Sequence, residues 1–171
     1  HAITVFHLIP SMLFALSNGA VDKKISTLRY ALFVGEALSR QDVAILQRLA
    51  PATQIINLYG TSETQRAVSY HLVETPSATE RSPLEAVPLG KGMPGTQLLV
   101  LNEQGQPAGI GELGELYMRS PHLALGYWRD PERTAARFLS NTWGQAPTDR
   151  LYRTGDFGRY RPDGQVDFGG R

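Results

Sequence analysis

The chain has 171 residues, of which 42% are apolar and 19% are charged, and its formal net charge is +1. That length is enough for one sizeable hydrophobic core and for two small domains at most, while the scattered charges predict neither a nucleic-acid partner nor a membrane surface. With no cysteine and four separated histidines, the sequence excludes disulfides and thiolate metal sites and has no zinc-binding spacing.

We expect neither a membrane span nor a signal peptide in these residues. No apolar run reaches the roughly 18 residues that a membrane span requires, and residues 1–8 have neither the basic region nor the cleavage site of a signal peptide. The absence of cysteine fits a reducing compartment, so we expect a cytoplasmic protein. The chain begins inside an apparent strand and stops at Arg171 without a closing helix, so we expect a fragment of a longer protein.

Strands and helices alternate in the first part of the chain. Apolar, β-branched runs predict strands over residues 3–8, 28–34, 54–59 and 66–73. Helical spacing predicts helices over residues 10–17 and 39–50, with Ser39 as the cap of the second. Such alternation is typical of a parallel sheet, whose ligands gather beyond the carboxyl ends of the strands. We therefore expect His7, Val34 and residues 58–63 along one edge.

The composition changes after residue 73. Residues 74–88 are rich in Pro, Ser, Thr and Glu and are the expected linker between an α/β portion, residues 1–73, and a β-rich portion, residues 89–171. Short runs bounded by glycine-rich turns predict strands over residues 97–101, 114–118, 151–153, 158–161 and 165–168. We expect them to form a small β-barrel or a distorted sheet. One helix, residues 130–138, has Asp130 as its cap and Pro131 at its first position.

Two stretches match the dinucleotide-binding pattern Gly-x-Gly-x-x-Gly, at residues 90–95 and 109–114. Each precedes a predicted strand and neither opens a helix, so the helix N-terminus that would bind a pyrophosphate is missing. We interpret both as turns into strands.

The stretch from Tyr59 to Glu63 is the most informative part of the sequence. It follows a predicted buried strand, and Gly60 allows a sharp turn where a Cβ atom would be crowded. Thr61 and Ser62 can donate hydrogen bonds to phosphate oxygens, and the carboxylate of Glu63 suits Mg²⁺. The pattern therefore indicates nucleotide chemistry, although Gly-Thr-Ser is also common in ordinary turns.

A second candidate site lies near the end of the chain. Asp156 ends the run Tyr-Arg-Thr-Gly-Asp, and its carboxylate can accept hydrogen bonds from two vicinal ribose hydroxyls. The alternative is an ordinary hairpin turn. Arg171 is placed either to pair with Asp156 or to reach a nucleotide. Phe168 either stacks on a base or fills the core, and the core is the default for such a residue.

Taken in order, these stretches resemble the adenylate-forming superfamily, and within it the adenylation domains of nonribosomal peptide synthetases. The motifs that carry the resemblance lie at residues 57–63, 114–117, 126–127, 138, 152–156 and 169–171. Residues 59–70, with Thr61 where the family usually has proline, and residues 149–156 resemble the α-aminoadipate reductases in particular. The resemblance implies a flavodoxin-like α/β portion with a parallel sheet, followed by a barrel-like β-rich portion, in a larger N-terminal subdomain.

The resemblance also implies an enzyme with two steps. ATP and a carboxylic acid, here an amino acid, would give an acyl-adenylate, and the acyl group would then pass to the phosphopantetheine thiol of a carrier domain. Ser62 would contact phosphate and Glu63 would hold Mg²⁺, while Tyr59 would lie against adenine with Gly60 and Thr61 beside the nucleotide. Asp156 and Arg171 would bind the ribose.

The acyl pocket of the family aligns with six residues here, His7, Leu32, Val34, Leu58, Arg66 and Ala67. An arginine in an otherwise apolar pocket needs a partner, so the resemblance implies a substrate with a second carboxylate, such as α-aminoadipate. The alternative is that Arg66 points to solvent.

Some parts of the family pattern differ or are missing. Leu125 stands where many relatives have arginine, and the upstream phosphate loop, the aspartate for the substrate amino group and the C-terminal subdomain with its catalytic lysine are absent from the sequence. We therefore expect this fragment to be inactive by itself. The rival interpretations are a carboxylic acid reductase or an acyl-CoA ligase, and, from another class, a nucleotide-binding module without chemistry.

Overall fold

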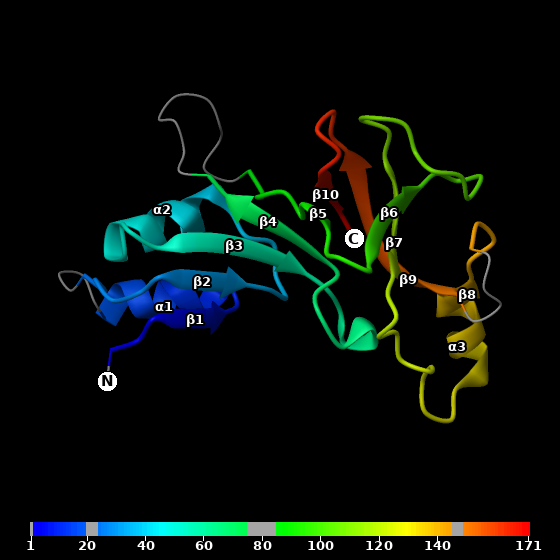
Figure 1. Ribbon diagram of the computed structural model, residues 1–171, viewed down its shortest axis with the longest axis horizontal. Helices are drawn as coiled ribbons and strands as arrows, with labels where there is room; N and C mark the ends of the chain where they lie inside the picture. The colour runs from blue at the N-terminus through cyan, green and yellow to red at the C-terminus, as the bar shows by residue number, and fades with distance from the viewer. Residues whose placement is uncertain (1, 20–23, 75–84, 145–148) are drawn as a thin grey trace. The chain divides into compact units, whose positions relative to one another are not determined.

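The computed structural model describes residues 2–19, 24–74, 85–144 and 149–171 (Figure 1). The chain divides into two compact units, unit 1 with His1–Leu58 and His71–Pro88, and unit 2 with Tyr59–Tyr70 and Leu89–Arg171. No helix in the described part of the chain is both long enough and apolar enough to span a membrane.

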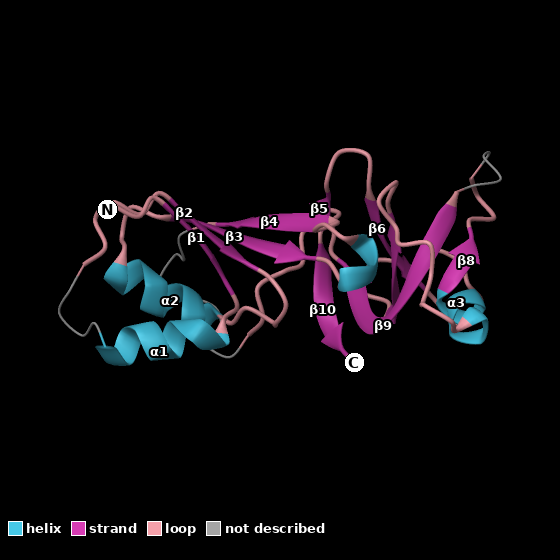
Figure 2. Cartoon of the chain, turned by 90° about the horizontal axis from the view of Figure 1, so that it is seen from below, coloured by secondary structure: helices cyan, strands magenta, loops and turns pink. Residues whose placement is uncertain are grey.

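Unit 1 contains the predicted alternation of strands and helices. Its elements are β1 (Val5–Leu8), α1 (Ser11–Gly19), β2 (Tyr30–Phe33), α2 (Arg40–Leu49) and β3 (Gln54–Tyr59). β1 pairs with β2, and β2 with β3, both in parallel, and α1 and α2 lie on the same face of these strands (Figure 2). The prediction of a parallel sheet with helical crossovers is therefore confirmed.

Helix α2 begins where the sequence predicts. The Ser39 hydroxyl accepts a hydrogen bond from the Asp42 amide (3.1 Å), and the Asp42 carboxylate accepts one from the Ser39 amide (3.0 Å). This reciprocal pair satisfies two amide groups that the first helical turn leaves unpaired. Val43 and Leu46 of this helix are buried in the core of unit 1.

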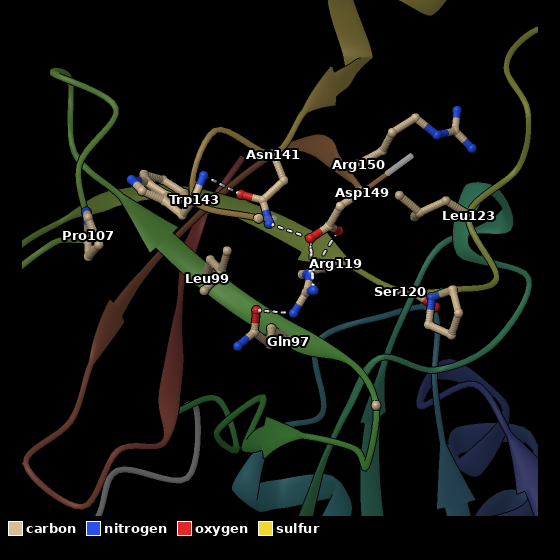
Figure 3. A pocket seen from close by; sticks show the side chains of 13 residues that line it. Gln97, Leu99, Pro107, Arg119, Ser120, Leu123, Asn141, Trp143, Asp149 and Arg150 are labelled. Atoms are coloured by element: carbon tan, nitrogen blue, oxygen red, sulfur yellow. Dashed lines mark hydrogen bonds and ion pairs between the residues drawn. The ribbon is translucent and has the colours of Figure 1, made fainter. Parts of the chain in front are cut away.

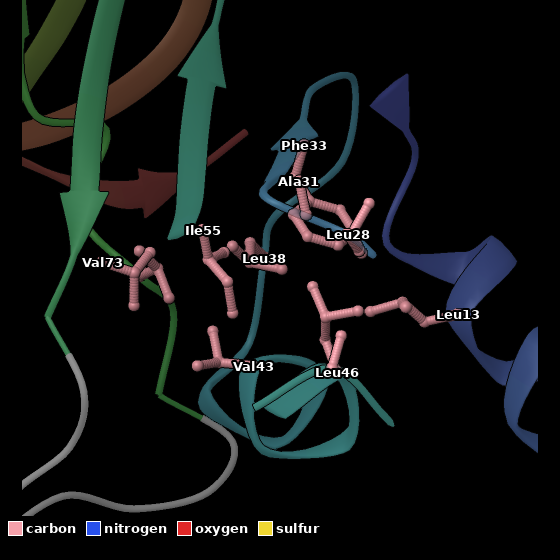
Figure 4. Close-up of a cluster of buried hydrophobic side chains, with 11 residues drawn as sticks. Leu13, Leu28, Ala31, Phe33, Leu38, Val43, Leu46, Ile55 and Val73 are labelled. Atoms are coloured by element: carbon pink, nitrogen blue, oxygen red, sulfur yellow. The ribbon is translucent and has the colours of Figure 1, made fainter. Parts of the chain in front are cut away.

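The core of unit 1 packs the apolar face of the sheet against the helices (Figure 4). Its buried members are Leu13, Leu28, Ala31, Phe33, Leu38, Val43, Leu46, Ala50, Ile55, Val73 and Val87. The buried Asn57 amide donates a hydrogen bond to the carbonyl of Pro88 (2.9 Å), which ties the last residue of the expected linker to β3. Residues 75–84, most of that linker, lie outside the described residues, so the predicted boundaries at 73 and 89 stay predictions.

Unit 2 is built on an antiparallel sheet of the order β10-β9-β7-β6, with β8 paired to β9. Its strands are β6 (Gln97–Leu101), β7 (Gly114–Arg119), β8 (Phe138–Ser140), β9 (Arg150–Tyr160) and β10 (Val166–Gly170). β4 (Ser69–Val73) pairs antiparallel with the short β5 (Lys91–Gly92). The β-rich second portion predicted from the sequence is thus confirmed.

Two local predictions for unit 2 are confirmed and one is wrong. Helix α3 (Pro131–Arg137) begins with Asp130 as its cap, which accepts from the Arg133 amide at 2.9 Å, and the glycine motifs at 90–95 and 109–114 lead into strands. The strands predicted at 151–153 and 158–161 are instead one strand, β9, because the residues between them continue as a bulge. The sequence also did not predict β5, β8 or the 3₁₀ helix Ser62–Thr64 (η1).

Candidate functional site

The Thr-Gly-Asp stretch forms a bulge inside β9. Tyr117 of β7 pairs with Arg153, and Glu115 pairs with Phe157, so three residues of β9 lie opposite the single residue Leu116. Gly155 takes a φ of 80°, in the left-handed region that favours glycine. The chain does not reverse here, so the hairpin alternative is wrong.

The buried Thr154 hydroxyl closes this bulge. It donates to the carbonyl of Leu116 (2.8 Å) and accepts from the amide of Asp156 (2.9 Å). One hydroxyl therefore satisfies two backbone groups that the irregular strand pairing leaves without a ladder partner. This arrangement fixes the backbone at Asp156.

Asp156 is the centre of a three-residue cluster within unit 2. The Tyr59 hydroxyl donates to its Oδ2 at 2.6 Å, and the Nε atom of Arg171 lies 3.2 Å from its Oδ1. Burial and the hydrogen bond to Asp156 raise the pKa of Tyr59, so the phenol stays protonated and remains a donor. Each carboxylate oxygen has two lone pairs, so both oxygens retain capacity to accept from a ligand.

Of the two alternatives for Arg171, the structure has the ion pair with Asp156. The Arg171 side chain is 78% exposed, so screening by water keeps this pair weak. Phe168 is partly buried and packs against the core of unit 2, which agrees with the default interpretation. Its proposed contact with a base stays a prediction.

Gly60 connects β3 to η1 without room for a side chain. A Cβ atom there would lie 2.7 Å from the carbonyl oxygen of Arg66 and 2.8 Å from Cα of Ala67. The crowding predicted from the sequence is therefore confirmed. At the other end of η1, Gln65 has a φ of 58°, which is uncommon for a residue other than glycine.

The turn from Thr61 to Arg66 is held by Thr64, a residue that the sequence did not single out. Its buried hydroxyl accepts from the Thr61 amide (3.1 Å) and lies within donating distance of the carbonyl of Arg66 (2.7 Å). The Thr61 hydroxyl oxygen is also buried, and it has no hydrogen-bond partner among the described residues. Ser62, in contrast, is exposed. The Ser62 hydroxyl is thus accessible to a ligand on this turn, whereas the Thr61 hydroxyl is unpaired but buried.

Glu63 of η1 is held by a second network within unit 2. The Tyr127 hydroxyl donates to Glu63 Oε1 at 2.7 Å and lies 3.3 Å from the Tyr152 hydroxyl. Burial pushes the pKa of Glu63 upwards, but the hydrogen bonds, that from Tyr127 foremost, outweigh it and hold the pKa below its usual value. The carboxylate is therefore ionised at neutral pH. Sequence reasoning missed both tyrosines as partners, although both lie in motifs that carry the family resemblance.

The groups around Glu63 suit Mg²⁺ that is bound by one carboxylate together with substrate phosphates and water. No group of three or more His, Cys, Asp or Glu side chains within the described ranges is arranged to hold a metal. Mg²⁺ is commonly held by one or two carboxylates together with substrate phosphates and water. A single ionised carboxylate beside the exposed Ser62 hydroxyl fits that mode.

The six residues of the expected acyl pocket belong to both units. His7, Leu32, Val34 and Leu58 are in unit 1, where His7 is exposed and the other three are partly buried; Arg66 and Ala67 are in unit 2, where Arg66 is exposed. Their assignment to one pocket stays a prediction.

Unit 2 also has an open groove of about 990 Å³ that is distinct from these residues (Figure 3). Its lining residues include Leu99, Arg119, Leu123, Asn141, Trp143 and Asp149. The Arg119 guanidinium donates to both oxygens of Asp149 (2.8 and 2.9 Å), and Asn141 donates to the same carboxylate. These charges are paired, and no residue predicted to bind the nucleotide lines the groove.

Comparison with known proteins agrees with this fold and these motifs. The family described as AMP-binding enzyme matches residues 1–128. L-2-aminoadipate reductases of Schizosaccharomyces pombe and Saccharomyces cerevisiae are 39% and 40% identical to the chain over its whole length. The chain spans 14% of each of these relatives.

Solved structures of similar fold also match nearly the whole chain. The N-terminal subdomain of Klebsiella oxytoca NpsA, in complex with 3-hydroxybenzoyl-AMSN, has a TM-score of 0.83 at 27% identity, over 99% of this chain and 42% of that one. CmiS6 has a TM-score of 0.86 at 35% identity, over 99% of this chain and 41% of that one. The fold and the motifs define an adenylate-forming domain, of which the chain is part of the N-terminal subdomain. The chain belongs to the AMP-binding enzyme family, and it is homologous to aminoadipate reductases and to the adenylation domains of nonribosomal peptide synthetases.

Proposed function

We propose that the polypeptide containing this chain activates an amino acid with ATP and passes it to a carrier domain. A carboxylate oxygen of the substrate attacks the α-phosphorus, and the bond from that phosphorus to pyrophosphate breaks. The carrier thiol, after losing its proton, then attacks the acyl carbon and AMP leaves. The observation that carries this proposal is the Asp156 cluster, because the Tyr59 hydroxyl, 97 positions away in the sequence, and the Arg171 guanidinium meet on one carboxylate.

In this proposal the Asp156 cluster binds the nucleoside. The carboxylate accepts hydrogen bonds from the ribose hydroxyls, and Arg171 assists at the ribose. The Tyr59 ring lies against adenine while its hydroxyl holds Asp156. Phe168 stands beside the base, and Gly60 allows the backbone to approach it.

In this proposal the η1 turn binds the phosphates of ATP. The hydroxyls of Thr61 and Ser62 would donate to phosphate oxygens, and Glu63 would hold Mg²⁺. Bound there, Mg²⁺ neutralises phosphate charge. Glu63 and Ser62 act by positioning and by charge complementarity, which are the main sources of rate enhancement in phosphorus chemistry of this kind.

We infer a dicarboxylic amino acid, such as α-aminoadipate, as the substrate. Several relatives at 38–40% identity are named L-2-aminoadipate reductase. The Arg66 guanidinium has no ion pair among the described residues, so its charge is available to a second carboxylate. The other expected pocket residues, His7, Leu32, Val34, Leu58 and Ala67, would enclose the aliphatic part.

The test is amino-acid-dependent exchange of labelled pyrophosphate into ATP by the full-length protein. The acids are aminoadipate, glutamate, lysine, valine and benzoate. Arg66→Ala should lower exchange with aminoadipate by about tenfold or more, because a hydrogen bond to a charged group contributes about 1.5–3 kcal/mol. Arg48→Ala, on the exposed side of α2, is the matched control. Exchange with aminoadipate that survives in Arg66→Ala would remove the pocket assignment.

A second candidate is activation of an aryl acid, by a carboxylic acid reductase or an acyl-CoA ligase. It is favoured by the NpsA subdomain, whose complex contains 3-hydroxybenzoyl-AMSN. Exchange with benzoate alone would select it. ATP binding without exchange for any acid would select the non-catalytic module.

The carrier step is tested separately. PA1221, a structural relative at 32% identity, contains adenylation and PCP domains. We infer a phosphopantetheine-bearing carrier as the acceptor here. A mass shift of the carrier equal to the acyl group, dependent on ATP, would support this step, and acyl transfer to free coenzyme A alone would oppose it.

A further inference from the structure

Glu63 is enclosed on one side by residues 123–127, a short segment within the connection between β7 and α3. The Ala124 amide donates to the Glu63 carbonyl at 2.7 Å, and the Tyr127 hydroxyl donates to Glu63 Oε1 at 2.7 Å. The segment therefore holds both the backbone and the side chain of Glu63.

The enclosing segment is itself fixed from two sides. Arg150 of β9 donates to the carbonyls of Ala124 (3.0 Å) and Leu125 (3.2 Å). The Tyr127 amide donates to the Thr134 hydroxyl of α3 at 2.8 Å. The backbone on either side of the Tyr127 ring is thus anchored to a strand and to a helix.

The Tyr127 ring is held by packing that does not involve its hydroxyl. It meets the Phe138 ring edge-on with centroids 5.6 Å apart, and the Arg133 guanidinium lies 4.4 Å from its centroid. Removal of the hydroxyl alone should therefore leave the ring in place. The Tyr152 hydroxyl lies 3.3 Å from the Tyr127 hydroxyl, within hydrogen-bonding distance.

We propose that Tyr127 is a positioning residue for Glu63, with Tyr152 as its support. The Tyr127 hydroxyl holds one carboxylate oxygen of Glu63, so that the carboxylate keeps a single orientation toward Mg²⁺ and the phosphates of bound ATP. This inference rests on the proposed function. Its alternative is that the two tyrosines only fill the core of unit 2.

The test measures ATP affinity of the full-length protein by calorimetry, once with saturating Mg²⁺ and once with EDTA. Tyr127→Phe should weaken binding of Mg·ATP by about tenfold, the effect of one hydrogen bond to a charged group, and leave binding in EDTA unchanged. Tyr152→Phe should weaken it by about threefold, because its hydroxyl contacts that of Tyr127 and also interacts with Glu63. Tyr117→Phe is the control, since no described residue hydrogen-bonds to that hydroxyl.

A double-mutant cycle separates positioning from packing. If Tyr127 acts through Glu63, Tyr127→Phe should have no further effect on Mg·ATP affinity once Glu63→Gln is present. Additive effects, or an equal loss of affinity with Mg²⁺ and with EDTA, would overturn the proposal. If the unmodified protein bound ATP with no dependence on Mg²⁺, the magnesium role of Glu63 would fail, and this inference with it. Mg²⁺-dependent binding without exchange for any acid would leave the inference standing and reject the activation chemistry.

Discussion

Replacing Thr154 by valine tests whether one buried hydroxyl holds the bulge that presents Asp156. Valine has nearly the same shape, so the substitution removes the hydroxyl without opening a cavity. The carbonyl of Leu116 and the amide of Asp156 would lose partners at 2.8 and 2.9 Å. Each orphaned buried group costs about 1–3 kcal/mol, so the two together should lower the free energy of unfolding by about 2–6 kcal/mol.

The assay is urea unfolding followed by circular dichroism, with Thr142→Val as the control. Thr142 is exposed, and surface substitutions of this kind usually change stability by less than about 0.5 kcal/mol. We also expect weaker ATP binding by Thr154→Val, since Asp156 would lose its fixed backbone. A Thr154→Val protein as stable as the Thr142→Val protein would refute the bridging role of the hydroxyl.

Three further perturbations address the two clusters. Gly60→Ala should lower the melting temperature by several degrees, because the new Cβ atom would lie 2.7 Å from the carbonyl oxygen of Arg66; unchanged melting would mean that this turn yields easily. Tyr59→Phe removes the 2.6 Å hydrogen bond to Asp156 and should weaken ATP binding about tenfold, measured by calorimetry; equal affinity would disconnect Tyr59 from the ribose site. The pKa of Glu63 is lower in the folded protein than its ordinary value, so its contribution to stability is complete above the unfolded pKa of about 4.3 and is lost as pH falls through the folded pKa. Melting curves from pH 3 to 7 should show less acid sensitivity in Glu63→Gln than in the unmodified protein, and parallel curves would contradict this.

Local features of the fold could be predicted because they depend on neighbours in the sequence. Ser39 and Asp130 cap helices through residues three positions away, so a short window contains the whole interaction. The strands of unit 1 were recognisable as apolar runs of the length that a covered parallel sheet needs. Gly60 was predictable for the same reason, since the crowding atoms belong to Arg66 and Ala67.

The composition of each site depended on contacts between residues far apart in the chain. Asp156 and Arg171 were predicted as partners because they are near in sequence, and they form an ion pair. The Tyr59 hydroxyl reaches Asp156 across 97 positions, and Tyr127 reaches Glu63 across 64. No periodicity or turn rule specifies such pairs, because they follow from how the strands and loops of unit 2 pack.

By itself, the sequence determined the order of strands and helices in unit 1, the helix caps, the glycine turns and the chemical character of the two candidate sites. The tertiary structure decided that β9 runs unbroken through the Thr-Gly-Asp bulge and that the Thr154 hydroxyl closes it. It also decided that a tyrosine hydroxyl fixes each site carboxylate. The physical reason is that a buried polar group must find a partner wherever the fold brings one, whatever its distance along the chain.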